Sequence, residues 1–110
     1  MVVEIREYLT RDGWAPFSEW LSALPLNARA QIRTRLDRLE LGDFSSCLPV
    51  GDGVFELWVH VGPGYRVYYA VTGCVMVLLL CGSDDSVRNR DIIRAKLYWH
   101  DYELRTDGEE

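Results

Sequence analysis

Five side chains that could do chemistry lie close together in the middle of the sequence. They are a carboxylate, an imidazole, a guanidinium group and two large aromatic rings: Glu56, His60, Arg66, Trp58 and Tyr68. Arg66 could hold a phosphate through its planar, two-pronged guanidinium group. Glu56 and His60 could transfer protons, because an imidazole titrates near neutrality and a carboxylate can act as a base. Trp58 and Tyr68 could stack on nucleobases or anchor a protein partner.

Each of these residues also has a structural explanation. Arg66 could be paired with Glu56 or stacked on Trp58, and a salt-bridge role for Glu56 is at least as frequent as a catalytic one. A lone strand histidine such as His60 is more often a half-exposed surface residue. For Trp58 and Tyr68, the formal net charge of −5 favours a protein partner. A protein that binds nucleic acid tightly usually presents a basic surface.

A predicted β-hairpin brings the five side chains together. Residues 54–61 and 65–71 alternate and are rich in β-branched and aromatic residues, and Gly62-Pro63-Gly64 suits a tight turn between them. If Val61 lies opposite Tyr65, the pairs run outward as His60–Arg66, Val59–Val67, Trp58–Tyr68 and Leu57–Tyr69. Alternation then places the five side chains on one face. The other face is a core face with Phe55, Leu57, Val59, Tyr65, Val67 and Tyr69.

The rest of the chain predicts the elements that support this hairpin. In chain order they are a strand over 2–9, helices over 15–24 and 28–39, an irregular segment over 43–53, the hairpin, a strand over 75–81 and a helix from 87. Asn27 is expected to cap the second helix and Gly42 to end it. The apolar run 75–81 indicates a central strand that is buried on both faces. In the last helix a stripe is expected in the core, formed by Ile92, Ala95, Trp99 and Tyr102.

The element order β-α-α-β-β-β-α predicts an α+β fold. We expect a mostly antiparallel sheet that is packed by a helical hairpin and a C-terminal helix, in a single domain over residues 1–110.

Composition and charge restrict the class of protein. Any basic patch must be local, and there are two candidates: Arg29, Arg33, Arg35 and Arg38, and then Arg88, Arg90, Arg94 and Lys96. The three cysteines, Cys47, Cys74 and Cys81, have no metal-ligand spacing, so we expect free thiols and no metal site. No apolar run approaches the ~20 residues that cross a bilayer, and the N-terminus lacks the layout of a signal peptide. A cytoplasmic location is expected.

Motifs along nearly the whole chain carry a family likeness. They are Phe17-x-x-Trp20-Leu21, RxRLxRL over 33–39, Pro49-Val50-Gly51, Glu56-Leu57, GPGYRVYY over 62–69, LLLCG over 78–82, Asp91-Ile92 and YWxDY over 98–102. With these motifs the chain resembles the RelE/ParE superfamily of bacterial toxins, in particular the HigB-like addiction module killer proteins. GPGYRVY followed by LLLCG is the most specific combination.

The resemblance implies a RelE-like fold and a cytoplasmic toxin that is neutralised by an antitoxin, expected to be a small helix-turn-helix protein. The two proteins could form a heterotetramer. Many relatives cut mRNA in the ribosomal A site without a metal or cofactor, and ParE-like relatives act on DNA gyrase. In the nuclease relatives, basic residues hold the RNA and stabilise a phosphorane-like transition state. On this likeness the catalytic candidates are Arg66, His60 and Glu56. The candidates for RNA or partner binding are Trp58, Tyr68, Arg88 and Arg90.

The chain departs from its branch at three positions that are usually basic. Leu48 and Asp85 stand where lysine is usual, and Trp58 stands where arginine is usual. Fewer cations weaken the electrostatic stabilisation on which such catalysis depends. Two hypotheses follow: a ribosome-dependent mRNA endonuclease, attenuated by these changes, or a non-catalytic toxin that binds gyrase or only its antitoxin.

Overall fold

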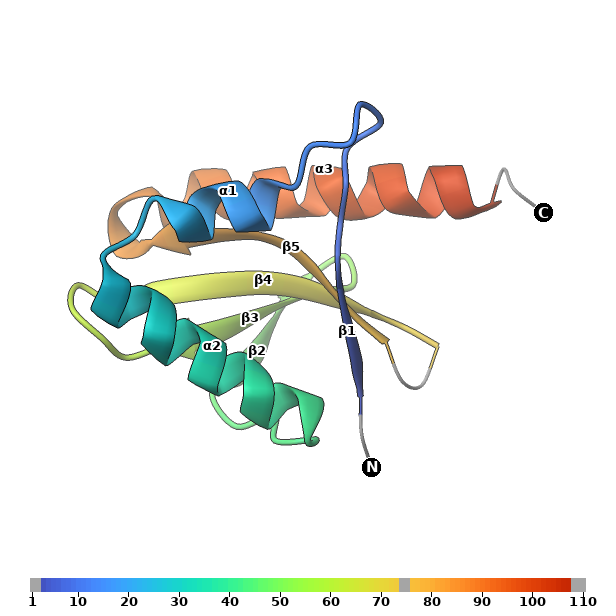
Figure 1. Ribbon diagram of the computed structural model, residues 1–110. Helices are drawn as coiled ribbons and strands as arrows, with labels where there is room; N and C mark the ends of the chain where they lie inside the picture. The colour runs from blue at the N-terminus through green and yellow to red at the C-terminus, as the bar shows by residue number, and fades with distance from the viewer. Residues whose placement is uncertain (1–2, 74–75, 108–110) are drawn as a thin grey trace.

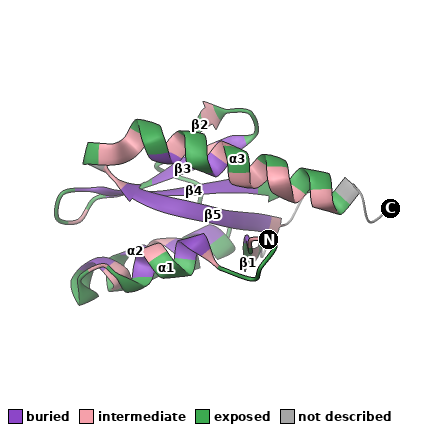
Figure 2. Ribbon diagram, turned by 90° about the horizontal axis from the view of Figure 1, so that it is seen from above, coloured by how far each residue is buried: buried purple, intermediate pink, exposed green. Residues whose placement is uncertain are grey.

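The computed structural model describes residues 3–73 and 76–107 and has an α+β architecture, as predicted. In the described residues a mixed sheet lies between α1 and α2 on one face and α3 on the other (Figures 1 and 2). The strands are β1 (Glu4–Glu7), β2 (Cys47–Gly51), β3 (Val54–Val59), β4 (Tyr65–Thr72) and β5 (Met76–Asp84). The helices are α1 (Pro16–Ser22), α2 (Leu26–Glu40) and α3 (Arg88–Asp107), with a 3-10 turn at Asp85–Val87 before α3.

The sheet has the strand order β1-β5-β4-β3-β2. Only the β1–β5 pairing is parallel, so the prediction of a mostly antiparallel sheet is confirmed. The apolar run that was expected at the centre forms β5, which is buried on both faces from Val77 to Cys81 but lies beside the middle strand, β4. Val75 and Cys74 lie outside the described residues.

The strand β2 was missed, and the element order therefore contains one more strand than predicted. Its segment is rich in turn-forming residues, which favoured an irregular loop. An edge strand tolerates proline, however, because the missing N–H can face away from the ladder. The strand pairs with β3: Cys47 lies opposite Leu57 and Leu48 lies opposite Glu56, before the register shifts between Pro49 and Gly51. As a result Leu48 lies beside the candidate site.

The hairpin forms, but its register differs from the predicted one by two residues. Trp58 lies opposite Arg66, and Val59 lies opposite Tyr65. The turn is longer than predicted because the backbone of Val61 is used within it: its N–H donates to Val59 (3.1 Å) and its carbonyl accepts from Gly64 (2.9 Å). A shift of two residues keeps every side chain on its predicted face. The core face of the hairpin is therefore confirmed.

One hydrophobic core lies between this face and the first two helices. α1 packs on β5 and α2 on β3, so the two helices cover different strands. Within α2 the buried positions are Ala28, Ile32, Leu36 and Leu39, as the periodicity predicted. The helix begins one residue before Asn27, with Pro25 in the N-cap position, so the predicted Asn27 cap is wrong. Gly42 ends the helix as expected, with a φ of 94° and its N–H bonded to Leu39.

A second core lies on the opposite face, under α3. Its buried members are Tyr8, Val54, Tyr68, Ala70, Leu78, Leu80, Cys81 and Ala95, and the predicted stripe of Ile92, Trp99 and Tyr102 packs against them. This face of the hairpin is therefore not an open polar surface, because α3 covers part of it.

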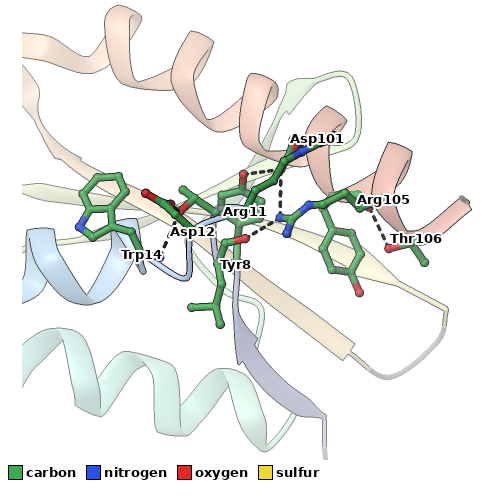
Figure 3. Close-up of polar contacts among 10 residues, drawn as sticks. Tyr8, Arg11, Asp12, Trp14, Asp101, Arg105 and Thr106 are labelled. Carbon is green, nitrogen blue, oxygen red and sulfur yellow. Dashed lines mark hydrogen bonds and ion pairs between the residues drawn. The ribbon is translucent and has the colours of Figure 1, made fainter. Parts of the chain in front are cut away.

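The C-terminal half of α3 is tied to the N-terminal strand region (Figure 3). The Tyr8 hydroxyl donates to Asp101 at 2.6 Å, and the guanidinium groups of Arg11 and Arg105 lie 3.2 and 2.9 Å from the same carboxylate. Burial and this hydrogen bond raise the pKa of Tyr8 to about 12. The hydrogen bond also holds the pKa of Asp101 below its usual value, so the link contributes to stability at neutral pH. That contribution is lost as the pH falls through the lowered pKa.

We expect Gly82→Ala to lower the free energy of unfolding by about 3 kcal/mol, at the upper end of the range for overpacked cores. A Cβ atom at this position would lie 2.2 Å from Cε3 of Trp20 and close to two further ring atoms. Urea unfolding followed by circular dichroism measures the loss.

The matched control is Gly13→Ala. A Cβ atom at Gly13 meets nothing within 4 Å, but the φ of 86° is unfavourable for alanine. This control should therefore lose only about 1 kcal/mol, from backbone strain. Equal losses in the two variants would mean that the contact between Gly82 and Trp20 does not limit the packing.

Candidate functional site

The candidate site lies where β3, β4 and β5 extend past the start of α3. Register places Trp58, Arg66 and Ser83 side by side across the three strands, and Glu56 beside Tyr68 in the next row. The convergence of Glu56, Trp58, Arg66 and Tyr68 on one face, predicted from alternation, is therefore present. Figure 1 shows that this end of the sheet leads directly into α3, which returns across the same face.

Glu56 is the centre of a buried charge cluster. Its side chain is only 5% exposed, and Nε of Arg66 lies 3.4 Å from its Oε2 atom. Arg88 binds both carboxylate oxygens, with Nε donating to Oε2 at 2.9 Å and Nη2 donating to Oε1 at 3.1 Å. We call Glu56, Arg66 and Arg88 the charge cluster.

The two arginines of the charge cluster differ in their access to solvent. The side chain of Arg66 is 10% exposed and that of Arg88 is 37% exposed. A ligand that approaches the site therefore meets Arg88 first. The sequence analysis placed Arg88 among the binding residues, but not in contact with Glu56.

Arg66 also stacks on an aromatic ring. Its Cζ atom lies 4.8 Å from the centroid of the Trp58 ring system, which is a cation–π distance. Both structural explanations given for Arg66 from the sequence thus hold together, since it is paired with Glu56 and stacked on Trp58. The guanidinium group is held in one orientation by these contacts. His60 directly follows the end of β3 and also packs on Trp58, with the centroids of the two rings 4.1 Å apart.

Tyr68 is not exposed, so the suggestion that it stacks on a nucleobase or anchors a partner is wrong. Its side chain is completely buried in the core under α3. Its hydroxyl lies 3.5 Å from Oγ of Ser83. Burial raises the pKa of Tyr68, and the negative charge of Glu56 raises it further. The phenol is therefore protonated and acts as a buried hydrogen-bonding group.

Arg90 lies outside the charge cluster. Its side chain is 63% exposed, and its Nε lies 3.5 Å from the buried carboxylate of Asp91. Together with Arg88 it lines a hollow at the start of α3 that continues outward from the cluster. Arg90 is thus placed to contact a ligand beyond the cluster rather than the group held at its centre.

Two exposed apolar side chains border the charge cluster. Leu48 lies opposite Glu56 in the sheet and is 62% exposed, and Trp58 is 40% exposed. These are two of the three positions at which the chain differs from the basic residues expected from the toxin resemblance. The third, Asp85, begins the 3-10 turn after β5, but its side chain is outside the described part of the structure.

Chemistry other than charge stabilisation has little support among the described residues. Cys47 and Cys81 are free thiols, and burial raises the pKa of Cys81 to about 12, so this thiol stays protonated. Within residues 3–73 and 76–107 no three His, Cys, Asp or Glu side chains are grouped to hold a metal ion. No described helix is both long and apolar enough to cross a membrane.

The arrangement is suited to binding an anion. The charge cluster holds two guanidinium groups in a partly buried place, where electrostatic interactions are stronger than in water. Both arginines contact the Glu56 carboxylate, which favours a role for Glu56 in positioning them over a role as a base. His60 is exposed beside Trp58, so its imidazole can contact a ligand bound at the charge cluster.

A relative of known sequence covers nearly all of this chain. A Haemophilus influenzae protein, described only as uncharacterized, is 44% identical over 98 residues, which are 88% of this chain and 93% of that protein. No protein-family model matches the chain.

Proposed function

The chain belongs to the same family as the Haemophilus influenzae protein, and we propose that it is a toxin that cleaves mRNA on the ribosome and is neutralised by an antitoxin. In this proposal residues 1–110 form one RelE-like domain that acts in the cytoplasm without a metal or cofactor. The partners are an antitoxin of the helix-turn-helix type and the ribosome with its mRNA.

The charge cluster is the observation that carries this proposal. RNA cleavage through attack of the ribose 2′-hydroxyl on the adjacent phosphorus passes through a phosphorane with additional negative charge. The 2′ oxygen gives up its proton to a base as it bonds to phosphorus. The P–O bond to the 5′ oxygen of the next nucleotide breaks, a 2′,3′-cyclic phosphate remains, and the released 5′ oxygen takes up a proton. Arg66 and Arg88, held by Glu56, are preorganised donors for the phosphorane oxygens. His60 is the group that we assign to proton transfer.

The missing cations give this activity a lower expected rate. Leu48 and Trp58 border the charge cluster without adding positive charge to it. Expression of the chain alone in bacteria should therefore slow growth, but less than expression of a relative with all the usual basic residues. Growth curves at matched expression test this, and normal growth at high expression would contradict a toxin of any mechanism.

A second candidate function is a toxin that binds a protein target without cleaving RNA. Exposed Leu48 and Trp58 favour it, because tryptophan is a frequent interface anchor. The net charge of −5 also favours a protein partner. In both functions the antitoxin is expected to cover this face of the sheet or an adjoining surface.

We expect Trp58→Ala to weaken the complex with the antitoxin by about 2 kcal/mol or more, as the loss of an interface anchor does. Trp14→Ala is the matched control, because Trp14 is similarly exposed (43%, against 40% for Trp58) and lies before α1. Calorimetry on the purified pair measures both. An unchanged affinity in Trp58→Ala would place the interface elsewhere, first of all on the arginine-rich α2.

A further inference from the structure

The outer face of α3 carries an apolar stripe that the proposed function does not explain. Ile93, Leu97 and Leu104 are 61%, 64% and 55% exposed. With the exposed His100 they follow the spacing i, i+4, i+7 and i+11, which places all four on one side of a helix. This side is opposite the one that packs on the sheet, and Figure 2 shows exposed residues along it. Grouped apolar residues of this kind indicate an interaction surface.

The stripe is symmetric about its own middle. Ile93 and Leu104 are equally far from the point between Tyr98 and Trp99, and so are Leu97 and His100. Two such helices related by a two-fold axis run antiparallel. Ile93 of one copy then meets Leu104 of the other, and Leu97 meets His100, so all four positions find a partner over about 16 Å of helix.

The charges beside the stripe select the same arrangement. The first half of α3 carries Arg88, Arg90, Arg94 and Lys96 together with the buried Asp91. The second half carries the exposed Glu103 and the partly exposed Asp101, together with Arg105, which is bound to Asp101. Lys96 and Glu103 are on the same flank of the stripe. An antiparallel pair brings Lys96 of each copy beside Glu103 of the other. A parallel pair would bring Lys96 near Arg94 and Glu103 near Asp101, so that like charges repel.

The local contacts leave this flank available. Asp101 is held by Tyr8, Arg11 and Arg105 of its own chain, so the complementary pair is Lys96 with Glu103. Nζ of Lys96 lies 3.4 Å from Asp52, and the two side chains are 29% and 78% exposed, so Lys96 exchanges a partly exposed ion pair for the one with Glu103.

From the symmetric spacing and the charge distribution we propose that the outer face of α3 pairs with the same face of a second copy of the chain, as an antiparallel helix pair. A contact through one helix face buries less surface than a standard protein–protein interface, so we expect a dissociation constant on the order of 10 μM. The proposal concerns self-association and does not depend on the toxin activity.

Sedimentation equilibrium of the purified full-length chain from about 1 to about 200 μM tests this, in a range that spans the expected dissociation constant. The average mass should rise from 12.7 kDa toward twice that value. Leu97→Glu should weaken the association at least about 10-fold, because it places a charge in the middle of the stripe. The matched control is Leu26→Glu, which changes a more exposed leucine (74%) at the start of α2 and should have no effect.

Charge reversal tests the orientation of the two helices. Glu103→Lys should weaken the dimer, and the double variant Lys96→Glu with Glu103→Lys should restore it. A constant mass of one chain at every concentration would overturn the proposal, including the case in which the stripe instead holds an antitoxin segment. A dimer that survives Leu97→Glu, or a double variant that does not recover, would overturn it as well.

Discussion

Arg66→Ala should lower ribosome-dependent mRNA cleavage roughly 100- to 1000-fold, the usual effect of removing one preorganised group that stabilises transition-state charge. Arg66 is fixed from two sides, by Glu56 at 3.4 Å and by the Trp58 ring at 4.8 Å, so its guanidinium group needs little reorganisation during the reaction. Glu56 keeps its two hydrogen bonds from Arg88 in the variant, and the fold should therefore persist. Cleavage of mRNA on programmed ribosomes measures the effect, with circular dichroism as the test of folding.

Arg66→Lys tests whether the shape of the guanidinium group matters in addition to its charge, and Arg33→Ala is the control for the loss of an arginine elsewhere. Arg66→Lys should recover little activity, because an ammonium group cannot donate two parallel hydrogen bonds to a phosphate. Arg33→Ala removes an exposed arginine of α2, away from the charge cluster, and should leave cleavage unchanged. Full activity in a folded Arg66→Ala protein would exclude Arg66 as a catalytic group, and Arg88 and Arg90 at the start of α3 would be the next candidates.

Restoring the missing cations should have the opposite effect. The double change Leu48→Lys with Trp58→Arg places two positive charges beside Glu56 and Arg66. It also removes the ring on which Arg66 stacks, but we expect the added charge to outweigh this loss and cleavage to rise about 10-fold. Leu48 lies opposite Glu56 in the sheet and Trp58 opposite Arg66, so both new side chains would border the charge cluster. The same ribosome assay measures the gain.

A charge control distinguishes a local from a general effect. Leu26→Lys with Leu41→Lys adds the same two charges at exposed positions at the two ends of α2 and should give little increase. An equal increase in both double variants would show that overall charge, and not its position beside the cluster, governs the rate. No increase in either would mean that the reaction relies on other residues.

Alternation in the hairpin was sufficient to predict which side chains share a face, because side chains point to opposite faces at every second residue. It could not predict the register. The register depends on backbone hydrogen bonds within the turn at Val61 and Gly64, which have no signature in the hydrophobic pattern. The error of two residues left the composition of the face intact but placed Arg66 opposite His60 instead of Trp58.

The burial of Tyr68 and the contact of Arg88 with Glu56 depend on α3, which is far from β3 in the sequence. The helix was predicted, but periodicity does not say which face of a sheet a helix covers. A signal for Arg88 was present nevertheless. β5 runs antiparallel to β4, so the residues that follow β5 must emerge beside the beginning of β4, where Arg66 lies. The place of Leu48 opposite Glu56 was not predicted for a different reason, since proline and glycine are atypical of strands and the edge strand β2 was expected to be irregular.

The most direct test of the central claim is primer extension on a defined mRNA after incubation of programmed ribosomes with the purified chain. The account predicts new 5′ ends within the codon in the ribosomal A site, which depend on the ribosome and disappear with Arg66→Ala. Intact mRNA in the presence of excess folded protein would contradict the proposed nuclease activity and leave the protein-binding toxin as the explanation for the exposed Leu48 and Trp58.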